Sequence, residues 1–198
     1  MVRTPVFVRG TAVALTLCFA SIHPLAAKPA ASASIEERID TLKPGHWVWR
    51  PELAAAGPVE IVVSLPLQIA YVYRGGTLIG AATVSTGMPG YDTPVGRFNI
   101  LQKRKEHYSN IYDNAPMPFM QRLTWDGIAL HAGAIPGEPA SRGCVRLPKT
   151  FAAKLYAATG LGATVLIVDD APSPEAAYAM VSGRTFGVAM GGPEEPVE

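Results

Sequence analysis

The sequence predicts a mainly β domain, a sandwich or barrel-like fold with one main helix. Short apolar or alternating runs recur from residue 59 onward, and Gly- and Pro-rich turns separate them, a pattern typical of all-β domains. The chain shows no regular alternation of strands with helices, which a parallel α/β sheet would require, and no internal repeat. Hydrophobic residues make up 48% of the 198 residues, which is enough to fill one core.

Seven strands are expected from these runs. The first is an uninterrupted apolar run, and the second alternates and is rich in β-branched and aromatic residues. Gly75-Gly76 predicts a hairpin turn between the second strand and the third. The expected strands are residues 61–65, 68–73, 77–86, 96–101, 119–125, 127–131 and 163–168.

The main helix is expected over residues 148–159, directly after the only cysteine in the second half of the chain. Pro148 opens it, Phe151, Leu155 and Ala158 share one face, and Gly160 follows it. Two shorter helices are expected at residues 35–42 and 174–181.

Residues 103–118 are polar and rich in turn residues, and a loop of this length in a compact domain is usually functional. One interpretation is a lid over a cleft. The other is ordinary loop packing of His107, Tyr108, Tyr112 and Met117.

The composition argues against several functional classes. The net charge is +1, so there is no electrostatic case for binding nucleic acid. The four histidines and two cysteines lack the spacing of a zinc site. We therefore expect no metal and no organic cofactor.

The N-terminus resembles a secretory signal peptide. Arg3 and Arg9 precede an apolar run at residues 11–22, and Leu25-Ala26-Ala27 offers small residues for cleavage. The run is short for a membrane span, so we expect export to the periplasm or cell envelope without stable membrane insertion after cleavage; an uncleaved anchor is the alternative. The expected organisation is a signal peptide at 1–27, a linker and packing segment at 28–58, the main domain at 59–169, and a C-terminal tail at 170–198.

Cys144 is the leading candidate for a reactive residue. It would be the only cysteine left after signal removal, in a compartment where structural cysteines are normally paired. Arg142 and Arg146 flank it, and His131 lies thirteen residues upstream, where it could accept the thiol proton. These residue types predict a cysteine nucleophile with a histidine base; an inert buried thiol or a disulfide-linked dimer are the alternatives.

The loop around the cysteine has the composition of an oxyanion hole. Gly133 and Gly143 allow the backbone to approach a substrate closely. Backbone N–H groups around Arg142, Gly143 and Cys144 are the expected donors.

These residues resemble the active-site motif of the L,D-transpeptidases, the YkuD-type catalytic domain. The motif comprises His131-Ala132-Gly133 and the run Ser141-Arg142-Gly143-Cys144-Val145-Arg146-Leu147. The resemblance covers about residues 59–169 and includes the segments 67–73, 84–87, 91–98 and 114–118.

The resemblance implies a β-rich fold and chemistry on peptidoglycan stem peptides, which serve as donor and acceptor. Cys144 would be the nucleophile that forms a thioester, His131 its base, and the Ala132 carbonyl would orient the imidazole. Arg142 would stabilise the thiolate or the oxyanion. The resemblance also implies that carbapenems label the cysteine. The expected substrate-binding residues are Arg146, which would hold a carboxylate, together with Gly133 and Ser141, the last of which we interpret first as structural.

The sequence leaves the acyl acceptor open. The resemblance allows the amine of a neighbouring stem, a D-amino acid, a lipoprotein lysine, or water. Water would make the protein an L,D-carboxypeptidase or endopeptidase. A wall-binding protein without turnover is the alternative from another functional class.

Overall fold

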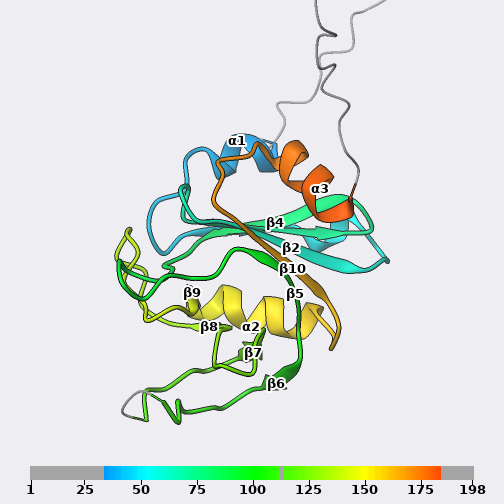
Figure 1. Cartoon of the computed structure of the whole chain (residues 1–198). Helices are drawn as coiled ribbons and strands as arrows, with labels where there is room; N and C mark the ends of the chain where they lie inside the picture. Colours follow the sequence, from blue (N-terminus) through cyan, green and yellow to red (C-terminus); the bar gives the residue numbers. More distant parts are fainter. Residues whose placement is uncertain (1–33, 112–113, 184–198) are drawn as a thin grey trace, which may run out of the picture. The chain divides into compact units, whose positions relative to one another are not determined.

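Two β-sheets form the frame of the computed structural model (Figure 1). The structure describes residues 34–111 and 114–183. The predicted signal peptide at 1–27 and the last residues of the predicted tail lie outside the described part. No helix among the described residues is long and apolar enough to cross a membrane.

The large sheet has six strands in the order β1-β4-β3-β2-β10-β5. Neighbouring strands in this sheet run antiparallel to each other, except for β2 and β10, which run parallel. The strands are β1 (Trp47–Trp49), β2 (Val59–Ser64), β3 (Ile69–Arg74), β4 (Thr77–Thr83), β5 (Gly96–Asn99) and β10 (Thr164–Val168).

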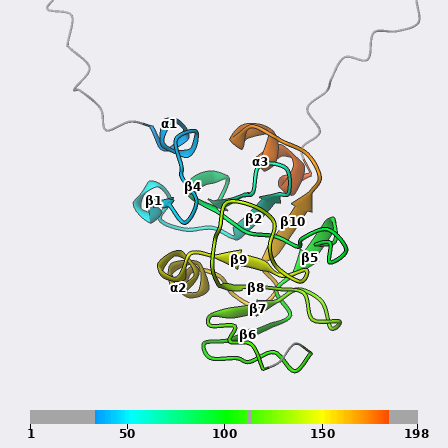
Figure 2. The ribbon, with the colours of Figure 1, turned by 90° about the vertical axis from the view of Figure 1, so that its left-hand side faces the viewer.

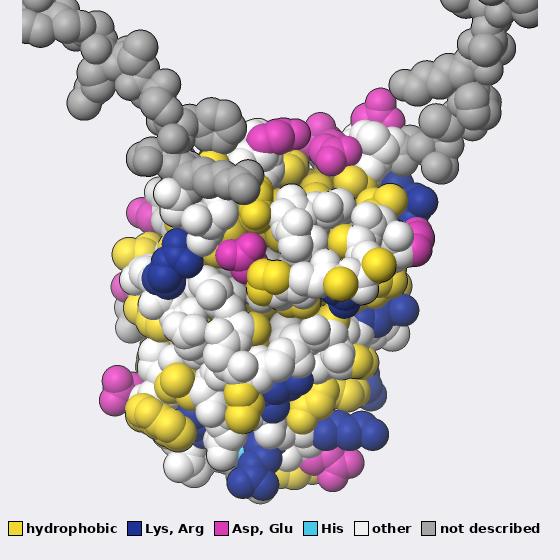
Figure 3. Space-filling model, turned by 90° about the vertical axis from the view of Figure 1, so that its right-hand side faces the viewer, with side chains coloured by type: hydrophobic (Ala, Val, Ile, Leu, Met, Phe, Trp, Pro, Cys, Tyr) yellow, Lys and Arg dark blue, Asp and Glu magenta, His cyan; other side chains and the backbone are white. Residues whose placement is uncertain are grey.

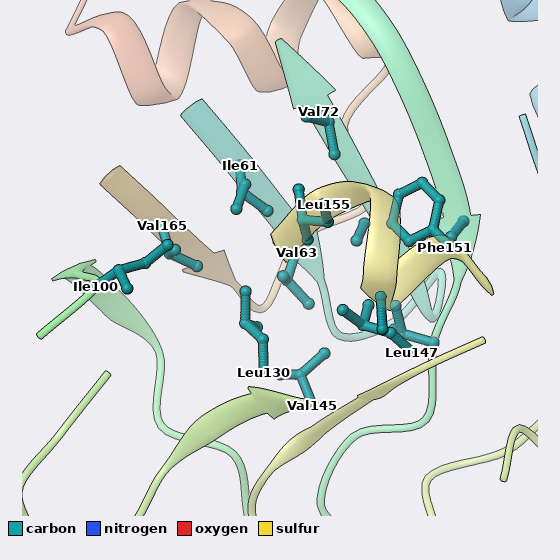
Figure 4. Packing of buried hydrophobic residues seen from close by; sticks show 14 of the residues in the cluster. Ile61, Val63, Val72, Ile100, Leu130, Val145, Leu147, Phe151, Leu155 and Val165 are labelled. Atoms are coloured by element: carbon teal, nitrogen blue, oxygen red, sulfur yellow. The ribbon is translucent and has the colours of Figure 1, made fainter. Parts of the chain in front are cut away.

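The central strands of the large sheet are buried on both faces, which explains the uninterrupted apolar run of β2. Ile61 and Val63 point into the main core, while Val62 packs on the opposite side. Figure 4 shows Ile61 and Val63 facing Leu130 and Val145 of the second sheet. The core therefore lies between the two sheets.

The small sheet has four strands in the order β6-β7-β8-β9 (Figure 2). Strands β8 and β9 are parallel, and the other pairs are antiparallel. The strands are β6 (Gln102–Arg104), β7 (Met120–Arg122), β8 (Ala129–Ala132) and β9 (Val145–Leu147).

Helix α2 (Lys149–Ala158) follows β9 directly and fills the space between the sheets. Phe151, Ala152 and Leu155 are fully buried on its inner face. Lys103 of β6 donates hydrogen bonds to the carbonyls of Tyr156 and Thr159, at 2.6 and 2.7 Å. A lysine from the small sheet thus satisfies carbonyl groups at the helix C-terminus, which would otherwise lack partners.

Elements from both ends of the described chain cover the outer face of the large sheet. Helices α1 (Ile35–Ile39) and α3 (Pro174–Ser182) pack there (Figure 1), and the 3-10 turn η1 (Pro51–Leu53) lies beside β4. The Tyr73 hydroxyl donates to the Pro174 carbonyl at 2.6 Å and ties α3 to β3.

The structure confirms the predicted fold class, a mainly β domain with one main helix after Cys144. Each of the seven expected strands overlaps an observed one, although the bounds differ and several observed strands are shorter. Three strands of three residues were missed, β1, β6 and β9, because so short a segment shows no periodicity of its own; β7 is equally short but lies within a longer predicted run.

Candidate active site

The register of the small sheet brings the two leading candidates to one face. His131 of β8 pairs with Arg146 of β9. Cys144 precedes β9 by one residue and shares the side of Arg146, because side chains alternate along a strand. Leu130 and Val145 point the other way, into the core. The imidazole and the thiol are therefore diagonal neighbours across two paired strands.

A cavity of about 870 Å³ lies over this face. Both Cys144 and His131 line it, and its size is in the range of small-molecule and peptide sites. The segment that we expected as a long loop provides part of one wall, where His107 and Met117 are joined by a 2.8 Å backbone hydrogen bond.

The imidazole of His131 is buried and bound by the neighbouring backbone. It is 8% exposed, and its Nδ1 lies 2.9 Å from the Ala132 carbonyl oxygen. A carbonyl only accepts, so Nδ1 carries the proton and Nε2 keeps its lone pair. Burial lowers the pKa of His131 to about 4, and the charges of Arg146 and His107 add to this, while the Ala132 hydrogen bond opposes it. The imidazole is therefore neutral at pH 7.

Cys144 rests as a thiol in apolar surroundings. Its Sγ lies 3.4 Å from the Gly127 carbonyl, and its apolar neighbours are Met117, Met120 and Ala129. Burial raises the pKa of the thiol, although a backbone hydrogen bond with Ala129 and two arginine charges, from Arg146 and Arg122, act to lower it. These two charges do not outweigh burial, although the arginines that flank Cys144 in the sequence had predicted a lowered pKa of the thiol. At rest the site holds a neutral thiol beside a neutral base.

The two motif arginines have different surroundings. Arg142 is exposed at the cavity rim. Arg146 is half-buried, and a Cβ added at Gly133 would come within 2.8 Å of its Cγ. Gly133 therefore makes room for the stem of Arg146.

Ser141 is fully engaged inside the loop. Its hydroxyl donates to the Cys144 carbonyl and accepts from the Gly143 N–H at 3.1 Å. The Gly143 N–H, which we expected among the oxyanion donors, is therefore already hydrogen-bonded. Gly143 itself has a φ of +101°, which favours glycine.

Cationic side chains outnumber carboxylates around the cavity. Arg122, Arg142, Arg146 and Lys149 line it, against the single carboxylate of Asp126. Figure 3 shows Lys and Arg side chains over both halves of one face, several of them at the level of the small sheet. The only ion pair within the described ranges joins residues far from the cavity, Arg50 and Glu52. The cavity is therefore suited to an anionic ligand.

Sequence reasoning missed several residues of the site. Arg122 of β7 and the Gly127 carbonyl reach it through strand pairing, and Thr93 donates a 2.8 Å hydrogen bond to the Gly143 carbonyl. Thr93 lay within a motif segment, but spacing assigned it no role. In the described part of the chain, no cluster of three His, Cys, Asp or Glu residues could hold a metal ion.

Comparison with known proteins shows which family this chain resembles in sequence and fold. The model of the L,D-transpeptidase catalytic domain (YkuD) matches residues 58–167. An L,D-transpeptidase from Stackebrandtia nassauensis is 31% identical with a TM-score of 0.53, over 60% of this chain and 59% of that one. An L,D-transpeptidase from Mycobacterium tuberculosis H37Rv has 24% identity and a TM-score of 0.54, over 56% and 57% of the two chains.

A third similar structure, an L,D-transpeptidase from Mycobacterium smegmatis, has 21% identity and a TM-score of 0.53, over 56% and 58% of the two chains. The match thus spans less than two thirds of each of these relatives. A search of curated proteins gave no match. The family model covers more than half of the chain, from β2 to β10, including both candidate residues. The chain belongs to the L,D-transpeptidase (YkuD) catalytic-domain family.

Proposed function

We propose that the protein is a cysteine-dependent L,D-transpeptidase acting on peptidoglycan stem peptides. The observation that supports this most directly is the placement of His131 and Cys144 on one face of the small sheet, over a cavity, in a domain of this family. The half-buried guanidinium of Arg146 supports recognition of a substrate carboxylate.

The first half-reaction is acylation of the enzyme. Cys144 Sγ adds to the carbonyl carbon of the third stem residue, and its proton passes to the free Nε2 of His131. The bond to the fourth residue then breaks, the leaving amine takes the proton from His131, and D-alanine departs. The product is a thioester on Cys144.

The second half-reaction transfers the acyl group to an amine. His131 Nε2 accepts a proton from the attacking amine, the carbon–sulfur bond breaks, and the sulfur recovers its proton. The proposed acceptor is the amine of a neighbouring stem or of a protein lysine. With water as acceptor, the same steps release a tripeptide.

We further propose that residues 1–27 direct export to the cell envelope and that residues 59–169 carry the chemistry, with residues 28–58 as a linker and packing segment and residues 170–198 as a C-terminal tail. N-terminal sequencing of the protein recovered from the envelope tests the export step. A start at Lys28 supports it, and an intact Met1 in the cell interior contradicts it.

The activity is tested with purified protein and disaccharide-tetrapeptide stems, followed by intact-protein and product mass spectrometry. The expected result is an acyl adduct that disappears in Cys144→Ala, together with dimers linked between third residues. His131→Ala should lose most of the rate as well, because the pair acts as a unit. Near-full turnover in either variant contradicts the assignment, and tripeptides alone identify water as the acceptor.

A further inference from the structure

Two buried hydroxyl groups hold the backbone before Cys144. The Ser141 hydroxyl binds the Gly143 N–H and the Cys144 carbonyl. The Thr93 hydroxyl accepts from the Gly87 N–H at 2.8 Å and donates to the Gly143 carbonyl at 2.8 Å. Thr93 is 5% exposed and comes from a loop about fifty residues earlier in the chain.

The hydrogen bond of Thr93 determines where another group points. The Gly143 carbonyl and the Cys144 N–H belong to one peptide unit, and in a trans peptide they point in opposite directions. Thr93 lies beside a second hollow of the surface, whereas Cys144 lines the cavity. Holding the carbonyl toward Thr93 therefore turns the Cys144 N–H toward the cavity side.

We propose that Thr93 is a positioning residue that aims the Cys144 N–H at the substrate oxygen during acyl transfer. As Sγ adds to the substrate carbonyl carbon, the carbonyl electron pair moves onto oxygen, and the thiol proton moves to His131. The Cys144 N–H then stabilises that oxyanion. This inference rests on the proposed function, because it concerns the same acylation step.

Gly143 explains why an outside anchor is needed. Its φ of +101° lies in the region that favours glycine, and the residue has no side chain that restrains the next peptide unit. A Cβ at this position would also approach the Ile128 side chain, at 2.9 Å. Ser141 does not bind the peptide unit that carries the Cys144 N–H, because its hydroxyl contacts the Gly143 N–H and the Cys144 carbonyl, which belong to the peptide units before and after it.

Gly87 completes the arrangement by letting the supporting loop fold back on itself. A Cβ at Gly87 would lie 1.9 Å from the Tyr91 carbonyl oxygen and 2.7 Å from the Thr93 nitrogen. The Gly87 N–H donates to the Thr93 oxygen, which uses one of its lone pairs. The single hydroxyl proton of Thr93 is donated to the Gly143 carbonyl.

The test compares two reactions of the same sulfur in Thr93→Val, a variant of similar shape without the hydroxyl. Acylation by imipenem or by p-nitrophenyl acetate passes through an oxyanion, whereas alkylation by iodoacetamide does not. We expect acylation to fall about 10- to 100-fold, below the ~10²- to 10³-fold cost of removing a whole oxyanion donor. Alkylation should stay within about twofold of the original protein.

Two further variants control the experiment. Thr93→Ser keeps the hydroxyl and should restore acylation. Thr86→Val removes a buried hydroxyl of the same segment that accepts from Gln68 Nε2 at 2.6 Å and does not contact Gly143, so both reactions should remain unchanged. Thr93→Ala provides the same comparison if Thr93→Val does not fold.

An equal fall of both reactions in Thr93→Val, or an unchanged acylation rate, overturns the inference. Failure of the proposed function looks different: the original protein would then form no adduct with tetrapeptide stems. In that case the p-nitrophenyl acetate to iodoacetamide ratio still decides the role of Thr93.

Discussion

Acidification should destabilise the native state through His131. The pKa of His131 is about 4 in the folded protein, because of burial, against 6.5 for an ordinary histidine. As the pH falls below 6.5 the unfolded chain binds a proton that the folded chain refuses, so the free energy of unfolding decreases. Each pKa unit corresponds to ~1.36 kcal/mol, so about 3 kcal/mol should be lost between pH 6.5 and pH 4.

Urea unfolding measured at half-unit pH intervals from 4 to 8 tests this value. Carboxylates also contribute to acid destabilisation, so the original protein is compared with His131→Gln. In this variant the free energy of unfolding should fall less steeply with decreasing pH, because the contribution of His131 is gone. His107→Gln is the matched control. Burial also lowers the pKa of this half-buried histidine, so the substitution should reduce the loss of unfolding free energy on acidification in the same direction but by less. A slope unchanged in His131→Gln would refute the reasoning.

The remaining predictions concern the thiol, the cavity charge, the helix C-terminus and the supporting loop. Imipenem should add once, at Cys144, as shown by peptide mass spectrometry; adducts elsewhere or none contradict the assignment. Arg146→Gln should raise the KM for tetrapeptide stems about tenfold or more, since a charged hydrogen bond contributes ~1.5–3 kcal/mol; an unchanged KM would assign the arginine a structural role. Lys103→Met should lower the free energy of unfolding by about 1–3 kcal/mol, because two carbonyls near the end of α2 lose their donor; thermal melts measure this, and Lys154→Met is the exposed control. Gly87→Ala should abolish acylation, because its Cβ would clash with the Tyr91 carbonyl, whereas Gly160→Ala, with open space around it, should not.

Periodic and strongly punctuated elements were predictable from the sequence. Short-range sequence patterns predicted three elements: β2 from its apolar run, β3 from its alternation, and α2 from the proline before it and the glycine after it. His131 and Cys144 were singled out from their residue types and neighbours as a candidate base and nucleophile, and the register of the small sheet brings them to one face.

What the sequence did not show depends on contacts between distant segments. β9 has three residues and becomes a strand only because it lies beside β8. Arg122 reaches the cavity through the register of β7, and the role of Thr93 exists only where its loop meets Gly143. The raised pKa of Cys144 likewise follows from burial, which cannot be read from the residues adjacent to it in the sequence.

The long-range support of the cysteine loop has a consequence for folding. Thr93 and Ser85 bind Gly143 and Arg146 across fifty residues or more, so no local segment can build the site alone. Contacts of such separation form slowly, because the intervening chain must first be ordered. A chain that is still extended, or only partly folded, therefore carries an ordinary cysteine. The proposed acyl transfer at Cys144 therefore requires both sheets to be assembled, which couples this chemistry to completion of the fold.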